Sequence, residues 1–306
     1  MQVVAIRGVV AAIATPVDEA LQPDHGALVD HARWLLSNGC DGLNVLGTTG
    51  SFASFTVAQR IDIMQALASS GLPLPAMMVG TGASALGDAV ALTRAAVALR
   101  FGGALVIPPF YYKGVSEDGV FTYVANLIEQ VGASELRMYL YNFPANSGVP
   151  YTVPLVKRLF AAYPGVIVGL KDSSNDAAYA AELHRELPQL DLFPSSESVL
   201  ADARRAGYAG CISASVNVTA PLTGRVWADG DDADGDARQG ELAAIRAAIL
   251  SVPSIPAIHH LLAQLHGDDV WSRLVPPLYA LDANERAALE ARLAQTVYHR
   301  EHAARR

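Results

Sequence analysis

The sequence predicts a (β/α)8 TIM barrel followed by a helical C-terminal region. Three observations favour this fold. Apolar, strand-like runs alternate with segments of helical periodicity, there are eight such runs, and no long insertion separates them. Most runs are apolar throughout, as expected for parallel strands that are covered on both faces. Eight successive βα units favour a closed barrel over the competing arrangement, an open doubly wound sheet.

The strand-like runs begin 19 to 34 residues apart. Helix starts lie between them: Thr56 to Gln59 reads as a capping box, Ser116 precedes two acids, and Thr152 precedes a first turn with Pro154. The runs are Val9–Val17, Gly42–Gly47, Pro75–Gly82, Gly103–Pro109, Arg137–Pro144, Val166–Ser174, Asp191–Glu197 and Gly210–Val218.

The pattern changes after the eighth run. We expect a catalytic barrel over residues 1–220 and an all-helical region over 221–306, packed on the barrel or on a partner subunit. The polar stretch 230–235 is interpreted as a loop, because it lacks the ligand spacing of a calcium-binding loop. The tail from residue 285 predicts an amphipathic helix with Leu289, Leu293 and Val297 on one face.

Composition excludes several classes of protein. The 306 residues are 51% hydrophobic and carry a formal charge of −8 without a basic patch, which argues against a nucleic-acid partner. The two cysteines, Cys40 and Cys211, form no metal or disulfide pattern. The N-terminus does not resemble a signal peptide, and no apolar run reaches the roughly 18 residues that span a membrane. We expect a cytoplasmic protein without a membrane partner.

Lys171 is the most informative residue. The chain has only three lysines, and Lys171 alone lies late in an apolar strand-like run. Lysine is rarely buried, and burial lowers the pKa of its amine, so that a neutral nucleophile exists near pH 7. Such an amine attacks a ketone to form an imine, which serves as an electron sink when a C–C bond breaks or forms. A structural lysine paired with Asp172 or another acid is the alternative. Lys113 and Lys157 are expected in solvent.

Polar residues at neighbouring strand ends fit this chemistry, because active sites of barrels lie at the C-terminal ends of the strands. Tyr141 precedes the lysine strand by one unit and could move protons. Thr48 and Thr49, in a glycine-flanked turn, could hold a carboxylate. Taken alone, Tyr141 fits a core aromatic and the threonine turn fits an ordinary loop; only together do they indicate a site.

These residues resemble those of the N-acetylneuraminate lyase and dihydrodipicolinate synthase family of class I aldolases. The similarity covers about Gly8 to Val218. Its motifs are GTTG at 47–50, PPFYY at 108–112, YNFP at 141–144, GLKDSS at 169–174 and GCISASVNV at 210–218, all in the family's order.

The resemblance implies a role for each matching residue. Lys171 would form the Schiff base with pyruvate, and Tyr141 would be the acid/base residue. Thr48, Tyr141 and Tyr111 would form a proton relay, with Tyr111 contributed across a subunit interface of a homo-oligomer, a dimer or homotetramer. Thr49 would bind the pyruvate carboxylate, and Ile212 would line the pocket through its backbone. No metal or other cofactor is implied.

Two departures from the family pattern affect the expected substrate. Ser51 replaces a supporting Glu. Asn146 stands where the synthases carry the Arg that binds the carboxylate of aspartate semialdehyde, and an amide supplies no cation. We therefore expect cleavage or dehydration of a 2-keto-3-deoxy sugar acid or related 4-hydroxy-2-oxo acid. Glu197, with Ser195 and Ser196, is a candidate for hydroxyl recognition. Dihydrodipicolinate synthase activity is the alternative.

Other functions fit less well. Gly80 to Ala85 matches a dinucleotide-binding turn, but the next strand-like run lacks the acid that such sites need. Neither a serine-hydrolase motif nor a zinc HExxH motif occurs. A barrel that binds keto acids without turnover is the remaining alternative, and the intact set of Lys171, Tyr141, Thr48 and Tyr111 argues against it.

Overall fold

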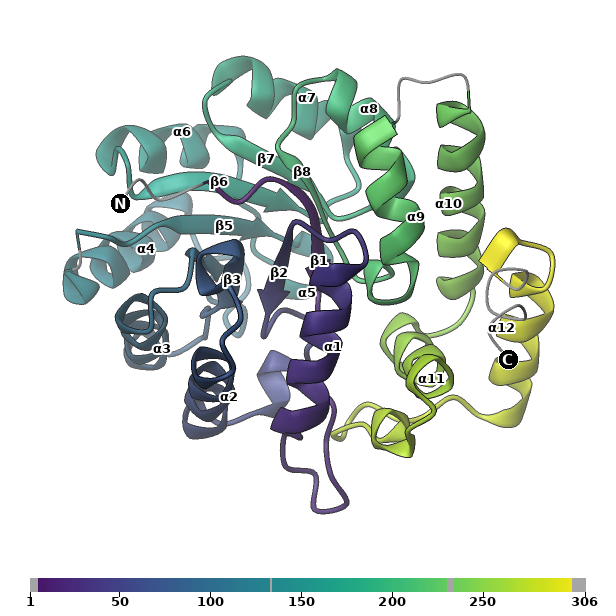
Figure 1. The fold of residues 1–306 in the computed structure, drawn as a ribbon. Helices are drawn as coiled ribbons and strands as arrows, with labels where there is room; N and C mark the ends of the chain where they lie inside the picture. The colour runs from purple at the N-terminus through teal and green to yellow at the C-terminus, as the bar shows by residue number, and fades with distance from the viewer. Residues whose placement is uncertain (1–4, 133, 230–233, 299–306) are drawn as a thin grey trace.

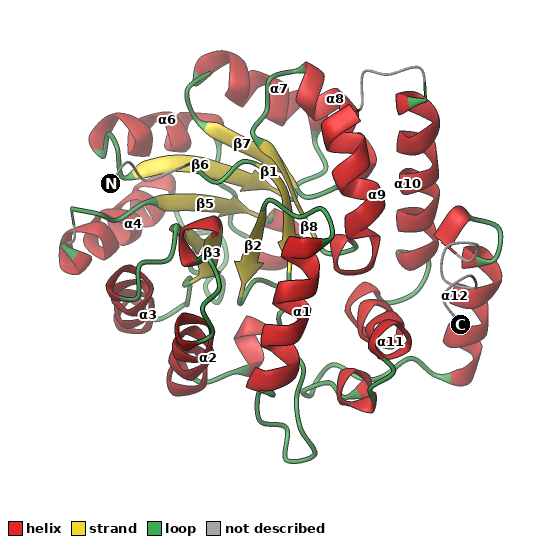
Figure 2. Cartoon of the chain, in the orientation of Figure 1, coloured by secondary structure: helices red, strands yellow, loops and turns green. Residues whose placement is uncertain are grey.

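A computed structural model describes residues 5–132, 134–229 and 234–298. Eight parallel strands form a barrel that helices surround (Figures 1 and 2), as predicted. The strands pair in the order β7-β6-β5-β4-β3-β2-β1-β8. They are β1 Gly8–Ala12, β2 Gly42–Val45, β3 Met77–Gly80, β4 Gly103–Val106, β5 Met138–Asn142, β6 Ile167–Asp172, β7 Asp191–Pro194 and β8 Gly210–Ser213.

The barrel has one seam, between β7 and β8. These strands are the two ends of the hydrogen-bonded order, and no ladder joins them among the described residues. The backbone N–H of Ala209 donates to the carbonyl of Leu192 at 2.9 Å, which holds the strands together at one point.

Helices follow the strands and cover the outside of the barrel. Thr56 closes the expected capping box with Gln59, and Ser116 and Thr152 cap their helices through their side chains. The helices are α1 His25–Ser37, α2 Val57–Ser69, α3 Leu86–Ala98, α4 Glu117–Val131, α5 Pro144–Ser147, α6 Val153–Ala162, α7 Ala177–Glu186, α8 Leu200–Arg205 and α9 Val216–Asp229, with short 3-10 turns η1 Phe52–Ser54, η2 Leu74–Ala76 and η3 Glu197–Val199.

The core has two layers, because side chains of a strand alternate between the two faces. One face fills the barrel interior, where Met78, Leu105, Tyr139, Phe193 and Ile212 are buried together. The opposite face packs against the helices. The barrel interior is therefore a packed core and not a channel.

The C-terminal region is helical, as predicted, and contains α10 Gly235–Ile249, α11 Ser254–His266, the turn η4 Asp269–Ser272 and α12 Ala283–Leu293. Leu289 and Leu293 are buried as expected, but α12 ends at Leu293, and Val297 is partly buried beyond it. The expected boundary at residue 220 falls inside α9, which follows β8 directly. Residues 230–233 of the expected loop, and the tail beyond 298, lie outside the described residues.

A chain of three side chains joins this region to the barrel. His266 Nε2 lies 3.0 Å from His31 Nδ1, and His31 Nε2 lies 3.1 Å from Asn217 Oδ1. Asn217 also donates to the carbonyl of Ala12 at 2.8 Å. Burial lowers the pKa of His31 to about 3, so this histidine is neutral.

No single described helix is long and apolar enough to span a membrane. Counted together, α10 and α11 meet the length and composition criteria, but they are bent by 108° relative to each other.

The predicted runs start close to the observed strands but overrun their ends. The run Gly210–Val218 contains β8 and then the start of α9, and Val9–Val17 continues past β1 into a loop. These extensions are buried too, so an apolar pattern alone does not show where the strand stops.

Candidate active site

Lys171 and Tyr141 lie side by side at the C-terminal ends of β6 and β5. They are register partners in the parallel ladder, and each side chain is only 4% exposed. The Lys171 Nζ lies 4.5 Å from the centroid of the Tyr141 ring. The two residues singled out from the sequence are therefore brought together at the mouth of the barrel.

The environment of Lys171 favours a neutral amine. Burial is the main cause and lowers the pKa of Lys171, because the ammonium loses its hydration. Tyr141 acts in the opposite direction, while the nearby Arg246 guanidinium lowers the pKa further. The alternative of a structural ion pair with Asp172 fails, because the described partners of that carboxylate are Asn142 and Ser174.

Thr48 connects to this pair from the loop after β2. Its Oγ1 lies 3.1 Å from the Tyr141 hydroxyl, so a proton can pass between the two oxygens. The turn is tight: a Cβ on Gly47 would lie 2.5 Å from Asn44 Oδ1, and one on Gly50 would lie 2.9 Å from the carbonyl of Ile13. The flanking glycines therefore permit the turn that presents Thr48 and the buried Thr49.

A small apolar pocket lies beside the Tyr141 ring. It is formed by the ends of the second to fifth strands and by Phe52, which contacts Phe110 edge-on at 6.1 Å between ring centroids. Ile212 closes the interior from β8 and is fully buried. The lining residues are Leu46, Gly47, Phe52, Gly80, Gly82, Leu105, Ile107 and Tyr141.

Asn142 and Asp172 form a second pair that the sequence analysis did not assign. They follow Tyr141 and Lys171 directly and are also register partners. Asn142 Nδ2 donates to Asp172 Oδ1 at 2.9 Å, and Asn142 Oδ1 accepts from the backbone of Tyr151 at 3.0 Å. This buried pair adds a side-chain hydrogen bond to the register that places Tyr141 beside Lys171. The sequence already contained an indication of this pair, because a polar residue directly follows each of the two predicted catalytic residues.

Tyr111 does not join the site within its own chain. Its side chain is 74% exposed and packs edge-on against Tyr112, at 5.2 Å between ring centroids. The hydroxyl of Tyr111 makes no hydrogen bond to a described residue. The contribution of Tyr111 across a subunit interface stays a prediction.

The residues expected to bind the distal part of the substrate lie in different loops, after β5 and after β7. Asn146 is exposed in α5, the one-turn helix after β5. Ser196 caps η3 and lies 2.6 Å from Ser198, oxygen to oxygen. Ser195 follows β7, and its backbone N–H donates to the carbonyl of Asp172 at 2.9 Å.

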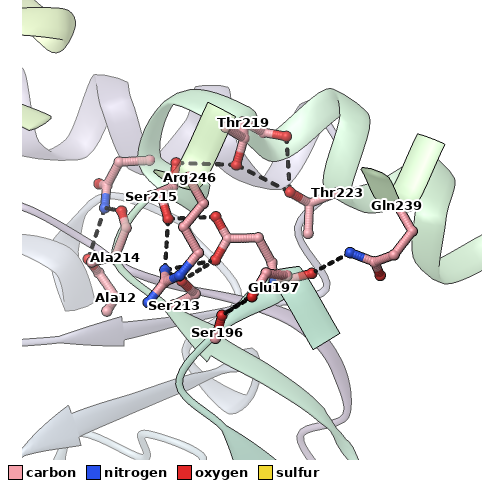
Figure 3. A network of polar contacts seen from close by, with 12 residues as sticks. Ala12, Ser196, Glu197, Ser213, Ala214, Ser215, Thr219, Thr223, Gln239 and Arg246 are labelled. Atoms are coloured by element: carbon pink, nitrogen blue, oxygen red, sulfur yellow. Dashed lines mark hydrogen bonds and ion pairs between the residues drawn. The ribbon is translucent and has the colours of Figure 1, made fainter. Parts of the chain in front are cut away.

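Glu197 is fully buried, with its carboxylate surrounded by donors (Figure 3). The hydroxyls of Ser213 and Ser215 donate to it, and Arg246 Nη1 lies 2.9 Å away. This arrangement does not support the expected role in hydroxyl recognition. Arg246 also balances the negative charge of Glu197. Arg246 lies 49 residues further along the chain and was not predicted at this site.

Among the described residues, no group of three or more His, Cys, Asp or Glu side chains could hold a metal ion. Cys40 and Cys211 are buried and unpaired, as expected. His259 is a core residue whose Nδ1 donates to the carbonyl of Trp271 at 2.9 Å.

Comparisons with known proteins show which proteins share this sequence and this fold. The sequence model of a protein family, described as the Dihydrodipicolinate synthetase family, matches residues 5–296 of the chain. The chain is 34% identical to an uncharacterized DapA-like lyase of Chloroflexus aurantiacus, over 93% of this chain and 95% of the relative. It superposes on dihydrodipicolinate synthase from Agrobacterium tumefaciens with a TM-score of 0.87 and 30% identity, over 94% and 99% of the two chains. It also superposes on YagE from E. coli K12, a prophage protein of the dihydrodipicolinic acid synthase family in complex with pyruvate. The TM-score is 0.86 and the identity 25%, over 95% and 99%.

Proposed function

Since the chain belongs to the dihydrodipicolinate synthetase family, whose members are class I pyruvate-dependent lyases and aldolases, we propose that it cleaves a 4-hydroxy-2-oxo acid into pyruvate and an aldehyde. The 2-keto-3-deoxy sugar acids belong to this substrate class. The observation that carries the proposal is the buried Lys171 amine beside Tyr141, whose hydroxyl reaches Thr48.

The chemistry begins at Lys171. The neutral amine attacks the C2 carbonyl, the carbonyl oxygen leaves as water, and a protonated imine forms between Nζ and C2. Tyr141 then removes the proton of the C4 hydroxyl and passes it toward Thr48. The C4 oxygen becomes the aldehyde carbonyl, and the electron pair of the C3–C4 bond moves into the imine to give an enamine. Protonation of C3 and addition of water at C2 release pyruvate and the free amine.

The carboxylate of the keto acid binds in the turn after β2. Thr49 is buried there, and Thr48 supplies a hydroxyl next to Tyr141. The pyruvate complex of YagE, which shares the fold over nearly its whole length, supports a keto acid as the substrate.

Condensation of pyruvate with aspartate semialdehyde is the second candidate. The 30% identity to the dihydrodipicolinate synthase of A. tumefaciens favours it. The exposed, uncharged Asn146 disfavours it, because the semialdehyde needs a partner for its carboxylate. We therefore propose cleavage as the main activity. A barrel that only binds keto acids is the remote alternative.

We further propose a cytoplasmic homo-oligomer, a dimer or a tetramer. The exposed Tyr111 and Tyr112 support this, because large aromatic side chains are enriched at subunit interfaces and these two protrude beside the barrel mouth. In such an assembly Tyr111 of one chain would complete the proton relay of another.

The test is pyruvate release from a panel of 4-hydroxy-2-oxo acids, measured by coupling to lactate dehydrogenase. The wild-type chain should release pyruvate from at least one member, and Lys171→Met should abolish the release. Lys157→Met is the matched control, since Lys157 is half-exposed and pairs with Glu186 at 2.5 Å. Equal activity of the Lys171 variant would refute the imine mechanism.

A further inference from the structure

Arg246 is held in a buried cluster at the C-terminal ends of β7 and β8 (Figure 3). Its Nη1 lies 2.9 Å from Glu197 Oε2 and 2.8 Å from the hydroxyl oxygens of Ser213 and Ser215. Both serines also donate to the Glu197 carboxylate. One nitrogen of the guanidinium is thereby fixed by side chains that are at most 1% exposed.

The other edge of the guanidinium has no hydrogen-bond partner in the part of the chain that the structure describes. The Nε and Nη2 atoms of Arg246 donate to no described residue, and the side chain stays 14% exposed while Glu197 is at 0%. Since Nη1 is enclosed by buried groups, the exposed part of the guanidinium lies at its Nε–Nη2 edge.

This edge belongs to the same end of the barrel as the catalytic lysine. Glu197 begins η3, directly after the loop that follows β7, and Ser213 is the last residue of β8. The C-terminal ends of the strands carry the active site in this fold. The guanidinium is also among the charges that act on the Lys171 amine.

The free edge has the geometry to bind a carboxylate. Two N–H groups in one plane match two carboxylate oxygens, and a charge-assisted pair of this kind is stronger than a neutral hydrogen bond. The C1 carboxylate of the substrate is assigned to Thr48 and Thr49 in the loop after β2. Arg246 lies beside β7 and β8 and is therefore available to bind the end of the substrate that is distant from C1.

Building on the proposed lyase activity, we infer that Arg246 is a specificity-determining residue that binds a second carboxylate at the far end of the substrate. The preferred substrates are 4-hydroxy-2-oxo acids with two carboxylates, and the aldehyde product retains one of them. Arg246, in helix α10 of the C-terminal region, supplies this positive charge, whereas Asn146 carries none.

The test compares two 4-hydroxy-2-oxo acids of equal length, one ending in a carboxylate and one in a hydroxymethyl group. The wild type should favour the dicarboxylate. Arg246→Met should lower kcat/KM for the dicarboxylate about 10- to 150-fold, mainly through KM, as expected from the loss of about 1.5–3 kcal/mol. The hydroxymethyl substrate should change far less. The ratio between substrates cancels any common effect of the variant on Lys171.

Removing one partner of a buried ion pair can destabilise the fold. The double variant Glu197→Gln with Arg246→Met removes both charges and should show the same change in the substrate ratio. Arg205→Met is the control, because Arg205 pairs with Asp202 and Asp236 at the surface, and it should leave the ratio unchanged.

The failure of this inference is distinct from the failure of the proposed function. If the wild type releases pyruvate equally from both substrates, or if both variants lose activity on both substrates equally, Arg246 does not select the carboxylate. If neither of these substrates nor any member of the wider panel releases pyruvate, and borohydride traps no pyruvate, the lyase function itself is wrong.

Discussion

Lys171 and Tyr141 occupy matched positions on adjacent strands, with the amine 4.5 Å from the centre of the phenol ring. The distance and the shared burial bring a nucleophile and a proton-transfer group to the same substrate carbon atoms without any loop rearrangement. The relationship depends on strand register, because a slip of one residue would turn one of the two side chains to the other face of the sheet.

Incubation with pyruvate and borohydride should place one reduced pyruvate per chain on Lys171. The lowered pKa of Lys171 makes its amine neutral at a lower pH than that of an ordinary lysine, so trapping should extend to lower pH than that of a free amine. Peptide mass spectrometry identifies the site. An adduct on Lys113, whose ammonium donates to the carbonyls of Phe110 and Ser147, would contradict the assignment.

Tyr141→Phe should lower turnover by about 10²- to 10⁴-fold, the range typical for general acid–base groups. The fold should be retained and pyruvate should still be trapped, since the ring remains and only the hydroxyl near Thr48 is lost. Tyr163→Phe is a matched control, because its hydroxyl bonds Glu129 at the surface. Turnover close to the wild-type rate would remove Tyr141 from the mechanism.

Mixing two inactive variants tests whether Tyr111 acts across an interface. Tyr111→Phe and Tyr141→Phe chains, refolded together, should regain up to about a quarter of wild-type activity. In a two-fold symmetric pair of unlike chains, one site receives both intact tyrosines and the other receives neither. Steady-state pyruvate release measures the recovery. Absence of recovery, with mixed oligomers present on a native gel, would place Tyr111 outside the shared site.

Aspartate semialdehyde should be a poor acceptor for condensation with pyruvate. Its ammonium group lies next to its carboxylate, and Arg246 attracts the second but repels the first. The four-carbon aldehyde acid without the ammonium should have the higher kcat/KM, measured by disappearance of the aldehyde. The reverse order of acceptors in the wild type would count against this assignment of charges.

Stability should fall as the pH drops from about 6.5 to 4. Burial lowers the pKa of His31 to about 3, below its unfolded value, so the unfolded state binds more protons in this range. The contribution is present above the unfolded pKa and is reduced by about 2 kcal/mol at pH 5. Urea unfolding at pH 7.5 and 5 measures it. His31→Gln should remove this part of the dependence and leave the part due to His259, whose pKa is lowered by burial to about 4. His260→Gln, at a partly exposed position, should leave the dependence unchanged.

The barrel and the proximity of Lys171 to Tyr141 could be predicted from the sequence, because both depend on local patterns. The apolar runs marked where each strand begins, and the scarcity of lysine made Lys171 conspicuous among buried positions. The capping box at Thr56 was equally local, and the structure confirms it.

The distal half of the site could not be predicted in this way. Arg246 is one of nineteen arginines and lies on a helix whose sequence looks like an ordinary amphipathic surface. Its pairing with Glu197 depends on how the C-terminal helices return to the barrel, a long-range packing that no short motif encodes. For the same reason Glu197 was given a substrate role although its carboxylate is occupied.

The seam between β7 and β8 gives the Arg246 cluster a second consequence. Glu197 follows β7 and Ser213 ends β8. Their hydrogen bond and the Arg246 guanidinium therefore connect the two strands between which the described residues form no backbone ladder. Substrate preference and barrel closure therefore share the same side chains. If Arg246 is replaced during evolution and the substrate changes, we expect compensating replacements at positions 197, 213 and 215. The reason is that loss of Arg246 alone would also lower the melting temperature.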